Sequence, residues 1–476
     1  MKIDYYVPLF ISTIICLSGC ALLSPHPKKP IINAPQQWRS QDNKTTIRPV
    51  SINTLAWWKK FHDPQLNQLM KEALTRNNDL GIATGNLLAA QAALQKVNFS
   101  WLPTLGGVGT GLSGRFSSRN IDAPTLPDPI SSVLNRSHFD GYFAGFVPDY
   151  TLNIITNIKE GQAARFNLAM QTAEKNAVRL GIISQVAGSY FSLLGLKKQL
   201  ILQEKMIHDA TALKNFTTIQ YQQGSVSKIR VASIEQFIAT LRKKTPKIRH
   251  DITKVENALN VLTNKNPGNI ITRNNFDNFS TQGIIPINLP SETLKARPDV
   301  AIAEYQLEIS HAMVGVAVSE LFPSISLTGL FGAASLQLTS LINAGQNFGA
   351  GLLFSKMPLV DMKVYSDIAR AKGKKYAAYF NYIKTVRSAF AEVDNALSQH
   401  ATVNQSYEQQ RIAVEKAQEQ YQIANNRYQQ GAISYSSTLL VKLNLDYMKA
   451  ALNQAKMQQM KSIVNLYQVL GGGACT

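Results

Sequence analysis

The tetrapeptide Tyr-Gln-Gln-Gly at positions 221–224 occurs a second time at positions 428–431. Other short segments recur in the same order, about 210 to 220 residues apart: 78–80 with 298–300, 101–104 with 321–324, and Pro148 with Pro358. Chance matches would not keep one order at a slowly drifting offset. The sequence therefore predicts a tandem duplication, with repeat one at 57–289 and repeat two at 290–476.

Each repeat is predicted to open with a helix and to continue with two strands. The opening helices are rich in Ala and Leu and end at a proline, which cannot continue a helix: 63–99 and 290–321. Residues 324–330 alternate small or polar with apolar, the period of a strand. The four strand candidates are rich in glycine and have the length of tilted membrane strands: 104–116, 138–149, 324–334 and 346–357. These lengths predict β-strands that cross a membrane.

A very long helix follows the strands in each repeat, at 151–221 and 359–428. At 1.5 Å per residue such a helix is about 105 Å long. Two rows of residues recur at heptad spacing and favour a coiled-coil seam over an ordinary core helix: Phe166, Ala173, Leu180, Ala187, Leu194 and Ile201 in one, Ala163, Met170, Ala177, Ser184 and Phe191 in the other. Each helix breaks at a glycine and resumes, to about 263 and about 467, which predicts hairpins with tips near 222–227 and 429–434.

Four strands are too few to close a barrel, and open sheet edges are not tolerated in lipid. Three chains would supply twelve strands, enough for a closed barrel with a lumen. The same threefold arrangement would join the long helices into a second tube. The predicted fold is thus mainly α with a small transmembrane β part: a trimeric twelve-stranded β-barrel, four strands per chain, and a long α-helical coiled-coil barrel in the periplasm.

The N-terminus has the features of a lipoprotein signal peptide at 1–19. A short basic start and the apolar stretch 5–17 precede Leu-Ser-Gly-Cys, where small residues before Cys20 fit a bacterial lipobox. Cys20 would then carry the covalent lipid, and several acyl chains would anchor the chain firmly. Ala21 after the cysteine favours the outer membrane, and the proline-rich stretch 20–56 is typical of an extended tether. An ordinary secretory signal is the alternative.

Composition argues against most other functions. The 49 Lys and Arg against 30 Asp and Glu give a net charge of +19, but the basic residues are scattered, so no nucleic-acid partner is expected. The three cysteines and seven histidines show no metal spacing. The segment 109–114 matches GxGxxG but leads into a polar loop, so it lacks the context of a nucleotide site. No further apolar stretch predicts a helical membrane span, and no motif predicts an enzyme or a cofactor.

Several longer motifs resemble the TolC-type outer-membrane efflux channels, and most closely their OprM and NodT lipoprotein branch. They cover nearly the whole mature chain: Trp58-x-x-Phe61-x-Asp63-Pro64, Ala73-Leu74-x-x-Asn77-x-Asp79-Leu80, Arg297-Pro298-Asp299-Val300, 321–329 and 464–473. The resemblance implies a passive homotrimeric conduit for drugs or other small molecules. Its implied partners are a periplasmic adaptor protein, an inner-membrane pump of the resistance-nodulation-division type and outer-membrane lipid.

The resemblance also implies which residues act. Adaptor contacts would lie at the two tips: Tyr221, Gly224, Ser227, Arg427, Tyr428, Gly431 and Ser434. Relatives close the periplasmic aperture with a Leu ring, an Asp ring and an Arg, and these positions correspond to Ser436, Leu440 and Leu443. Because the acidic ring is absent, we expect an aperture that is less cation-selective and less pH-sensitive than those of its relatives.

Two other functions remain open from the sequence. The channel could serve type I protein secretion, which uses the same channel type. A structural lipoprotein that tethers the envelope without a pore is the other alternative, although the four strands speak against it.

Overall fold

The structure is a computed structural model of the 476-residue chain. It describes residues 30, 38–39, 56–114, 139–279, 297–336, 338–339, 341, 346–356 and 361–473. The predicted signal peptide, Cys20 and most of the tether lie outside the described residues.

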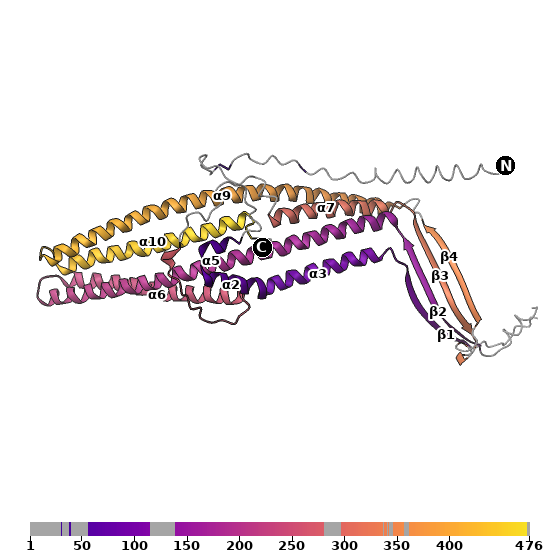
Figure 1. The fold of residues 1–476 in the computed structure, drawn as a ribbon, viewed down its shortest axis with the longest axis horizontal. Helices are drawn as coiled ribbons and strands as arrows, with labels where there is room; N and C mark the ends of the chain where they lie inside the picture. Colours follow the sequence, from indigo (N-terminus) through magenta and orange to yellow (C-terminus); the bar gives the residue numbers. More distant parts are fainter. Residues whose placement is uncertain are drawn as a thin grey trace, which may run out of the picture. The chain divides into compact units, whose positions relative to one another are not determined.

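The elements follow one order twice, as Figure 1 shows. In chain order they are η2 (Trp57–Phe61), α2 (Pro64–Arg76), α3 (Asn78–Phe99), β1 (Thr104–Gly114), β2 (Phe139–Leu152), α5 (Ile154–Gln222), α6 (Lys228–Leu262), η3 (Phe276–Asn278), α7 (Pro298–Ser319), β3 (Ser324–Ser335), β4 (Gln346–Lys356), α9 (Met362–Gln429) and α10 (Tyr435–Val469). The predicted class, long helices with a small four-stranded sheet, is confirmed.

The first helix of repeat one differs from the prediction, because it is broken at Asn77. This residue has extended backbone and its Oδ1 accepts hydrogen bonds from the N–H groups of Asp79 (2.9 Å) and Leu80 (3.3 Å). Its side-chain amide donates to the Leu262 carbonyl at 3.0 Å. Asn77 therefore ends α2 and caps α3, which satisfies N–H groups that a helix start leaves free.

The chain forms two compact units, each built from both repeats. Of the described residues, unit one contains those within 90–168 and 306–378, and unit two contains those within 30–89, 169–305 and 379–476. The helices α3, α5, α7 and α9 each contribute residues to both units, and each unit holds parts of both repeats.

Unit one holds a sheet with the strand order β1-β2-β3-β4, antiparallel throughout. Thr104 pairs with Asp149 and Ser324 with Lys356, so neighbouring strands run side by side over most of their length (Figure 1). The β2–β3 ladder lacks pairs at Val147 and Pro148, because proline has no N–H to donate. The pairs resume in the same register at Asp149 with Thr328.

Glycines make room for large groups on this sheet. A Cβ on Gly329 would lie 2.9 Å from Pro148 Cγ and 2.8 Å from the Phe331 ring. Gly145 and Gly332 face each other as register partners, and the Phe143 ring lies over both, at 2.8 Å and 3.0 Å from their would-be Cβ atoms. Any side chain at these positions would force the strands or the rings to move.

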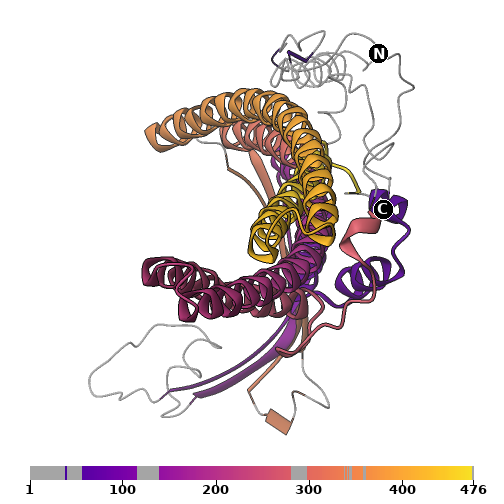
Figure 2. The same cartoon turned by 90° about the vertical axis from the view of Figure 1, so that its left-hand side faces the viewer.

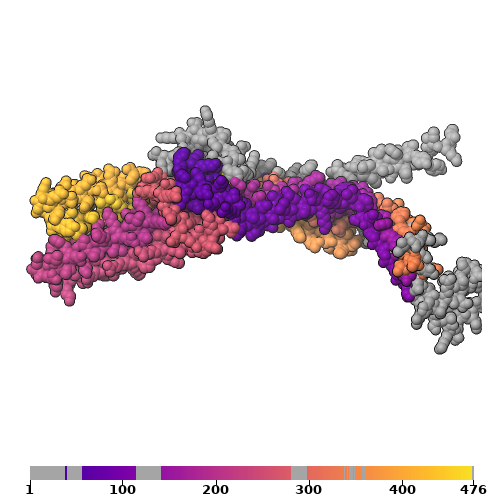
Figure 3. All heavy atoms as spheres, turned by 60° about the horizontal axis from the view of Figure 1, so that its bottom comes forward, coloured from indigo at the N-terminus to yellow at the C-terminus, as the bar shows by residue number. Residues whose placement is uncertain are grey.

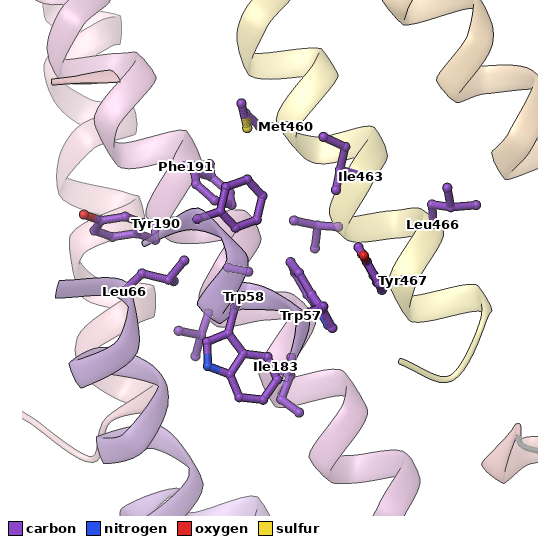
Figure 4. Packing of buried hydrophobic residues seen from close by; sticks show 14 of the residues in the cluster. Trp57, Trp58, Leu66, Ile183, Tyr190, Phe191, Met460, Ile463, Leu466 and Tyr467 are labelled. Atoms are coloured by element: carbon purple, nitrogen blue, oxygen red, sulfur yellow. The ribbon is translucent and has the colours of Figure 1, made fainter. Parts of the chain in front are cut away.

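Unit two contains the main hydrophobic core, which Figure 4 shows from close by. Trp57 is fully buried and stacks on Tyr467 of α10, with ring centroids 4.6 Å apart. Asp63 caps α2 through Oδ1, which accepts from the N–H groups of Gln65 (2.8 Å) and Leu66 (3.0 Å). Its Oδ2 accepts from the Tyr190 hydroxyl at 2.6 Å. This core ties η2, α2, α5 and α10 together.

The heptad rows of α5 are mostly buried. Ala173, Leu180, Ala187 and Leu194 are buried, whereas Ile201 is 66 % exposed. From there the buried row continues one residue later, at Leu202. A straight helix drifts about 20° per heptad, so after several heptads the inner face moves to the next residue.

Among the described residues, one helix, α5, is long and apolar enough to count as a candidate membrane span. A window of α5 reaches the required hydropathy, but 61 % of that window is buried inside the protein. A core helix of this kind passes the same test without crossing a membrane.

Candidate functional site

The two hairpin tips share one backbone geometry. Gly224 and Gly431 have positive φ angles of 76° and 74°. At each tip the glycine N–H donates to the carbonyl three residues back at 2.9 Å, and the next N–H donates to the carbonyl five residues back at 2.8 Å. These are the bonds of a glycine-terminated helix, and the left-handed conformation explains why glycine recurs.

The predicted tip residues lie on the surface. Tyr221 and Tyr428 are 42 % and 41 % exposed, and Gly224, Ser227, Arg427, Gly431 and Ser434 are exposed as well. Figure 2 views the two tips end-on, as neighbouring helix pairs. The structure thus brings the predicted tip residues together on the ends of two adjacent hairpins.

The surroundings of the tips differ between the hairpins. After the first tip come Lys228, Ile229 and Arg230, all exposed, with Ile229 at 77 %. After the second tip, Tyr435 packs against Phe216 of α5 at 5.7 Å and against Tyr428 at 5.3 Å between ring centroids. The segment after the first tip therefore presents cations and an apolar side chain, and the segment after the second presents Tyr435 and serines.

The three predicted aperture residues do not share one surface. Leu440 is 42 % exposed and Ser436 is partly exposed, with its Oγ 2.9 Å from Ser434 Oγ. Leu443 is only 8 % exposed and belongs to a cluster with Leu213 of α5 and Ile234 of α6. Within one chain Leu443 supports α10 from behind, while Leu440 faces outward.

Two ion pairs with buried carboxylates cross the contact between α5 and α10 beside this segment. Lys442 Nζ lies 2.9 Å from Asp209 Oδ1, and Lys205 Nζ lies 2.8 Å from Asp446 Oδ1. The two carboxylates are buried, with side-chain exposures of 5 % and 0 %. Figure 3 shows the second hairpin, in yellow, lying directly against the first, in magenta.

The side-chain hydrogen bonds of the sheet in unit one lie on one face, which also carries the exposed Leu112, Leu352 and Phe354. The register places the polar contacts on one face: Thr328 Oγ1 donates to Asp149 Oδ2 at 2.9 Å, and the hydroxyls of Thr151 and Ser326 lie 3.1 Å apart. The opposite face carries Leu105, Phe146, Phe331 and Leu353, which are 52 to 72 % exposed. Because a carboxylate in hydrocarbon is costly, the apolar face is the one that suits lipid.

Comparison with known proteins accounts for these features together. The sequence matches the family described as "Outer membrane efflux protein" over residues 69–265 and 289–472. The chain belongs to this family. It is 26 % identical over 476 residues to the probable outer membrane lipoprotein SilC of Salmonella typhimurium, covering 98 % of both chains. It is 27 % identical to the toluene efflux pump outer membrane protein TtgI of Pseudomonas putida, again over 98 % of both.

The fold agrees with a solved channel. The outer membrane channel CmeC of Campylobacter jejuni superimposes with a TM-score of 0.81 at 25 % identity, over 95 % of each chain. The resemblance to TolC-type channels is thereby confirmed, and the chain is an outer-membrane efflux channel that extends into the periplasm.

Its relatives are channels and not enzymes. Among the described residues, no three His, Cys, Asp or Glu side chains could together hold a metal ion.

The signature motifs of this efflux protein serve as structural anchors. The buried Arg297 guanidinium forms a two-pronged pair with Asp299 (3.0 and 2.7 Å), binds Glu392 at 2.6 Å, and donates to the Val469 carbonyl at 2.9 Å. Although burial lowers the pKa of Arg297, its bonds to the two carboxylates raise the pKa above its usual value. The motif thus joins the start of α7 to α9 and to the last residue of α10.

The sequence analysis missed the four residues of the two ion pairs between α5 and α10. Their signal was present, because Asp209 falls seven residues after Leu202 in the buried row of α5, and Asp446 seven after Leu439 in that of α10. A carboxylate at a core position of a coiled coil needs a partner. Which lysine supplies it depends on how the two helices pack.

Proposed function

We propose that this efflux protein is the passive exit channel of a tripartite assembly, formed by three copies of the chain. The observation that carries the proposal is the four-stranded sheet, whose β1 and β4 each pair on one side only among the described residues. Three sheets would join these edges into a twelve-stranded barrel, which leaves no edge in lipid. The apolar face with Phe146 and Phe331 would face the lipid, and Asp149 the lumen.

The hairpin tips would bind a periplasmic adaptor protein, which connects the channel to an inner-membrane pump, of the resistance-nodulation-division type. Support comes from the exposed residues at both tips, above all Tyr221, Ser227, Tyr428 and Ser434. Exposed aromatic and apolar side chains are common in protein interfaces. We propose no nucleic-acid partner, no catalysis and no cofactor besides the lipid on Cys20.

The aperture would be lined by Leu440, with Ser436 one turn toward the tip. Leu443 would act indirectly, because its side chain is in the chain's own core. A ring of three leucines can close a narrow passage by excluding water, without any charged group. The sequence assigned three residues to the aperture. We now propose that Leu440 and Ser436 line it and that Leu443 supports them from the core.

Small molecules are the proposed substrates. Toluene, in the name of the relative TtgI, is a small apolar molecule. The pump would select among substrates, and a passive tube would conduct what it receives.

Two measurements test this function. A photo-crosslinking residue at Ser227 or Ser434, with the exposed Ser406 on the side of α9 as the matched control, would identify the partner in cells. We expect the adaptor of a small-molecule pump from both tips and not from position 406. An adaptor of protein secretion would change the substrate class.

Conductance in planar bilayers tests the pore itself. We expect channels from the purified trimer. A trimer with neither conductance nor a captured adaptor would contradict the proposed function and favour a structural lipoprotein.

A further inference from the structure

The two ion pairs between α5 and α10 leave two carboxylate oxygens without a donor. Asp209 and Asp446 each use Oδ1 to accept from a lysine. Their Oδ2 atoms are buried, and no donor reaches either of them among the described residues. Buried polar atoms without a partner are rare in native proteins and need an explanation.

The proximity of the two carboxyl groups accounts for both oxygens that lack a donor. They lie within hydrogen-bonding reach, although each is paired with a lysine from the opposite helix. Two ionised carboxylates at this distance repel, and a single proton between them turns the repulsion into an O–H···O bond. A shared proton therefore satisfies both oxygens at once.

We propose that Asp209 and Asp446 form a proton-binding clasp, which holds α10 against α5 when one proton is shared between the two carboxyl groups. The two lysines balance the charge of the two ionised carboxylates, but they donate only to the Oδ1 atoms and do not reach the Oδ2 atoms. The clasp lies one turn beyond Leu443 and so bears on the segment that carries the candidate aperture residue Leu440. The proposal rests on the proposed function for this link to the aperture and for the trimer in which it is tested.

The surroundings favour proton binding. Burial raises the pKa of Asp446, and Asp209 raises it further, against the lowering effect of Lys205. From α6, the apolar residues Ile234, Ile238 and Leu241 belong to the hydrophobic cluster beside the pair, and Glu235 pairs with Lys214 of α5. The other titratable groups nearby are Lys205, Glu204 and His208 of α5, Lys442 and Lys449 of α10, and Tyr421 of α9.

The sign of the pH effect follows from the raised pKa. The folded clasp binds its proton more tightly than the unfolded chain does, so protonation favours the clasped state. That stabilisation is lost as the pH rises through the folded pKa. We therefore expect α10 to loosen at higher pH, which reverses the expectation of weak pH sensitivity drawn from the aperture residues alone.

Spin-label distances in the full-length trimer test the clasp. Asn444 is exposed on α10, so N444C in a C475S background gives one label per chain and one distance in a threefold trimer. From about pH 5 to about pH 8 we expect the ratio of long to short distances to rise, by at most about tenfold per pH unit for one proton. Asp446→Asn and Asp209→Asn should each remove this dependence, because an amide cannot titrate.

Matched controls separate the clasp from other titrating groups. His208 precedes Asp209 in the chain and is exposed, so His208→Gln should keep the full response. Glu419→Gln, which breaks an exposed pair with Lys416 on α9, should keep it too. If one aspartate variant fails to assemble, the other carries the test.

A flat wild-type profile, or an unchanged response in the aspartate variants, would overturn the proposal. Because the distances need only an assembled trimer, they do not depend on conduction. A pH response without bilayer conductance would leave the clasp standing and refute the proposed function.

Discussion

The two hairpins begin with the same turn and continue in different surroundings. In the first, α6 buries residues such as Ile234, Ile238 and Leu241 mainly along one side. In the second, α10 buries residues on most of its circumference, including the polar Asp446, Asn453 and Lys456. A duplicated segment has thus become a peripheral helix in one copy and a central helix in the other.

The difference shows that duplication preserves turn geometry better than packing. At each tip the turn depends on one glycine and the two local hydrogen bonds described above, which any copy of the sequence reproduces. The helix that follows depends on its neighbours, and α10 contacts α5 closely: a Cβ on Gly195 would lie 2.2 Å from Met457 Cγ. The following predictions test this contrast, from the largest expected effect to the smallest.

Gly195→Ala should destabilise the protein by about 3 kcal/mol, because the new methyl group overpacks the crossing of α5 and α10. Gly181→Ala is the matched control in the same helix, since nothing lies within 4 Å of its added Cβ. That change should be neutral or slightly stabilising, as alanine favours helix. Thermal unfolding of the purified variants measures both, and Met457→Ala should partly rescue the first. Equal stability of the two alanine variants would show that α10 is not tightly packed here.

Gly224→Val and Gly431→Val should cost about the same, roughly 2 kcal/mol of local stability each, because both positions have positive φ. Hydrogen exchange of the tip peptides measures the loss in each hairpin. The neighbouring Gln223 and Gln430 provide control positions for the same change. A large loss at only one tip would mean that the shared turn is maintained differently in the two copies.

His400 should make the second hairpin sensitive to acid. Its ring Nδ1 donates to Ser462 Oγ (2.9 Å), because that hydroxyl itself donates to the Gln459 carbonyl (2.7 Å). Its Nε2 accepts from the Asn404 amide at 2.7 Å, so the network requires neutral histidine. Burial lowers the pKa of His400.

The pH dependence of stability that His400 causes has the opposite sign to that of the clasp, because here protonation destabilises the folded protein. The unfolded chain gains the proton first, so stability falls as the pH drops below about 6.5, by at most about 1.4 kcal/mol per pH unit. His400→Gln should remove that slope in urea unfolding measured between about pH 5 and about pH 8. An unchanged slope would assign the acid sensitivity to another group.

Ser434→Ala and Ser227→Ala should differ slightly. Ser434 Oγ accepts from the Ser437 N–H at 3.2 Å and caps α10, whereas Ser227 makes no side-chain cap on α6. Loss of a cap costs about 1 kcal/mol, so only Ser434→Ala should speed hydrogen exchange in the first turn of its helix. Equal exchange in both variants would contradict the observed capping difference.

Much of this fold could be predicted from local patterns. Pro103 and Pro323 mark the ends of two helices, alternation identified the strand that begins at Ser324, and Gly224 and Gly431 marked the tips. The break at Asn77 was missed, because the apolar pattern continues through it. The site could be predicted only in part, because the sequence pattern places both Leu440 and Leu443 at the aperture, although one is exposed and the other buried.

The sequence by itself determined the duplication, the order of helices and strands, and the turns, because these depend on residues that are neighbours in the chain. Only the tertiary structure decided that Asp209 faces Asp446, that Lys442 pairs with Asp209, and that Leu443 supports α10 from inside. These contacts join residues more than 200 positions apart in the chain, at about the spacing of the repeats. They depend on which faces of the two long helices meet. The spacing of residues along a helix does not single out one face, because several faces show nearly the same period.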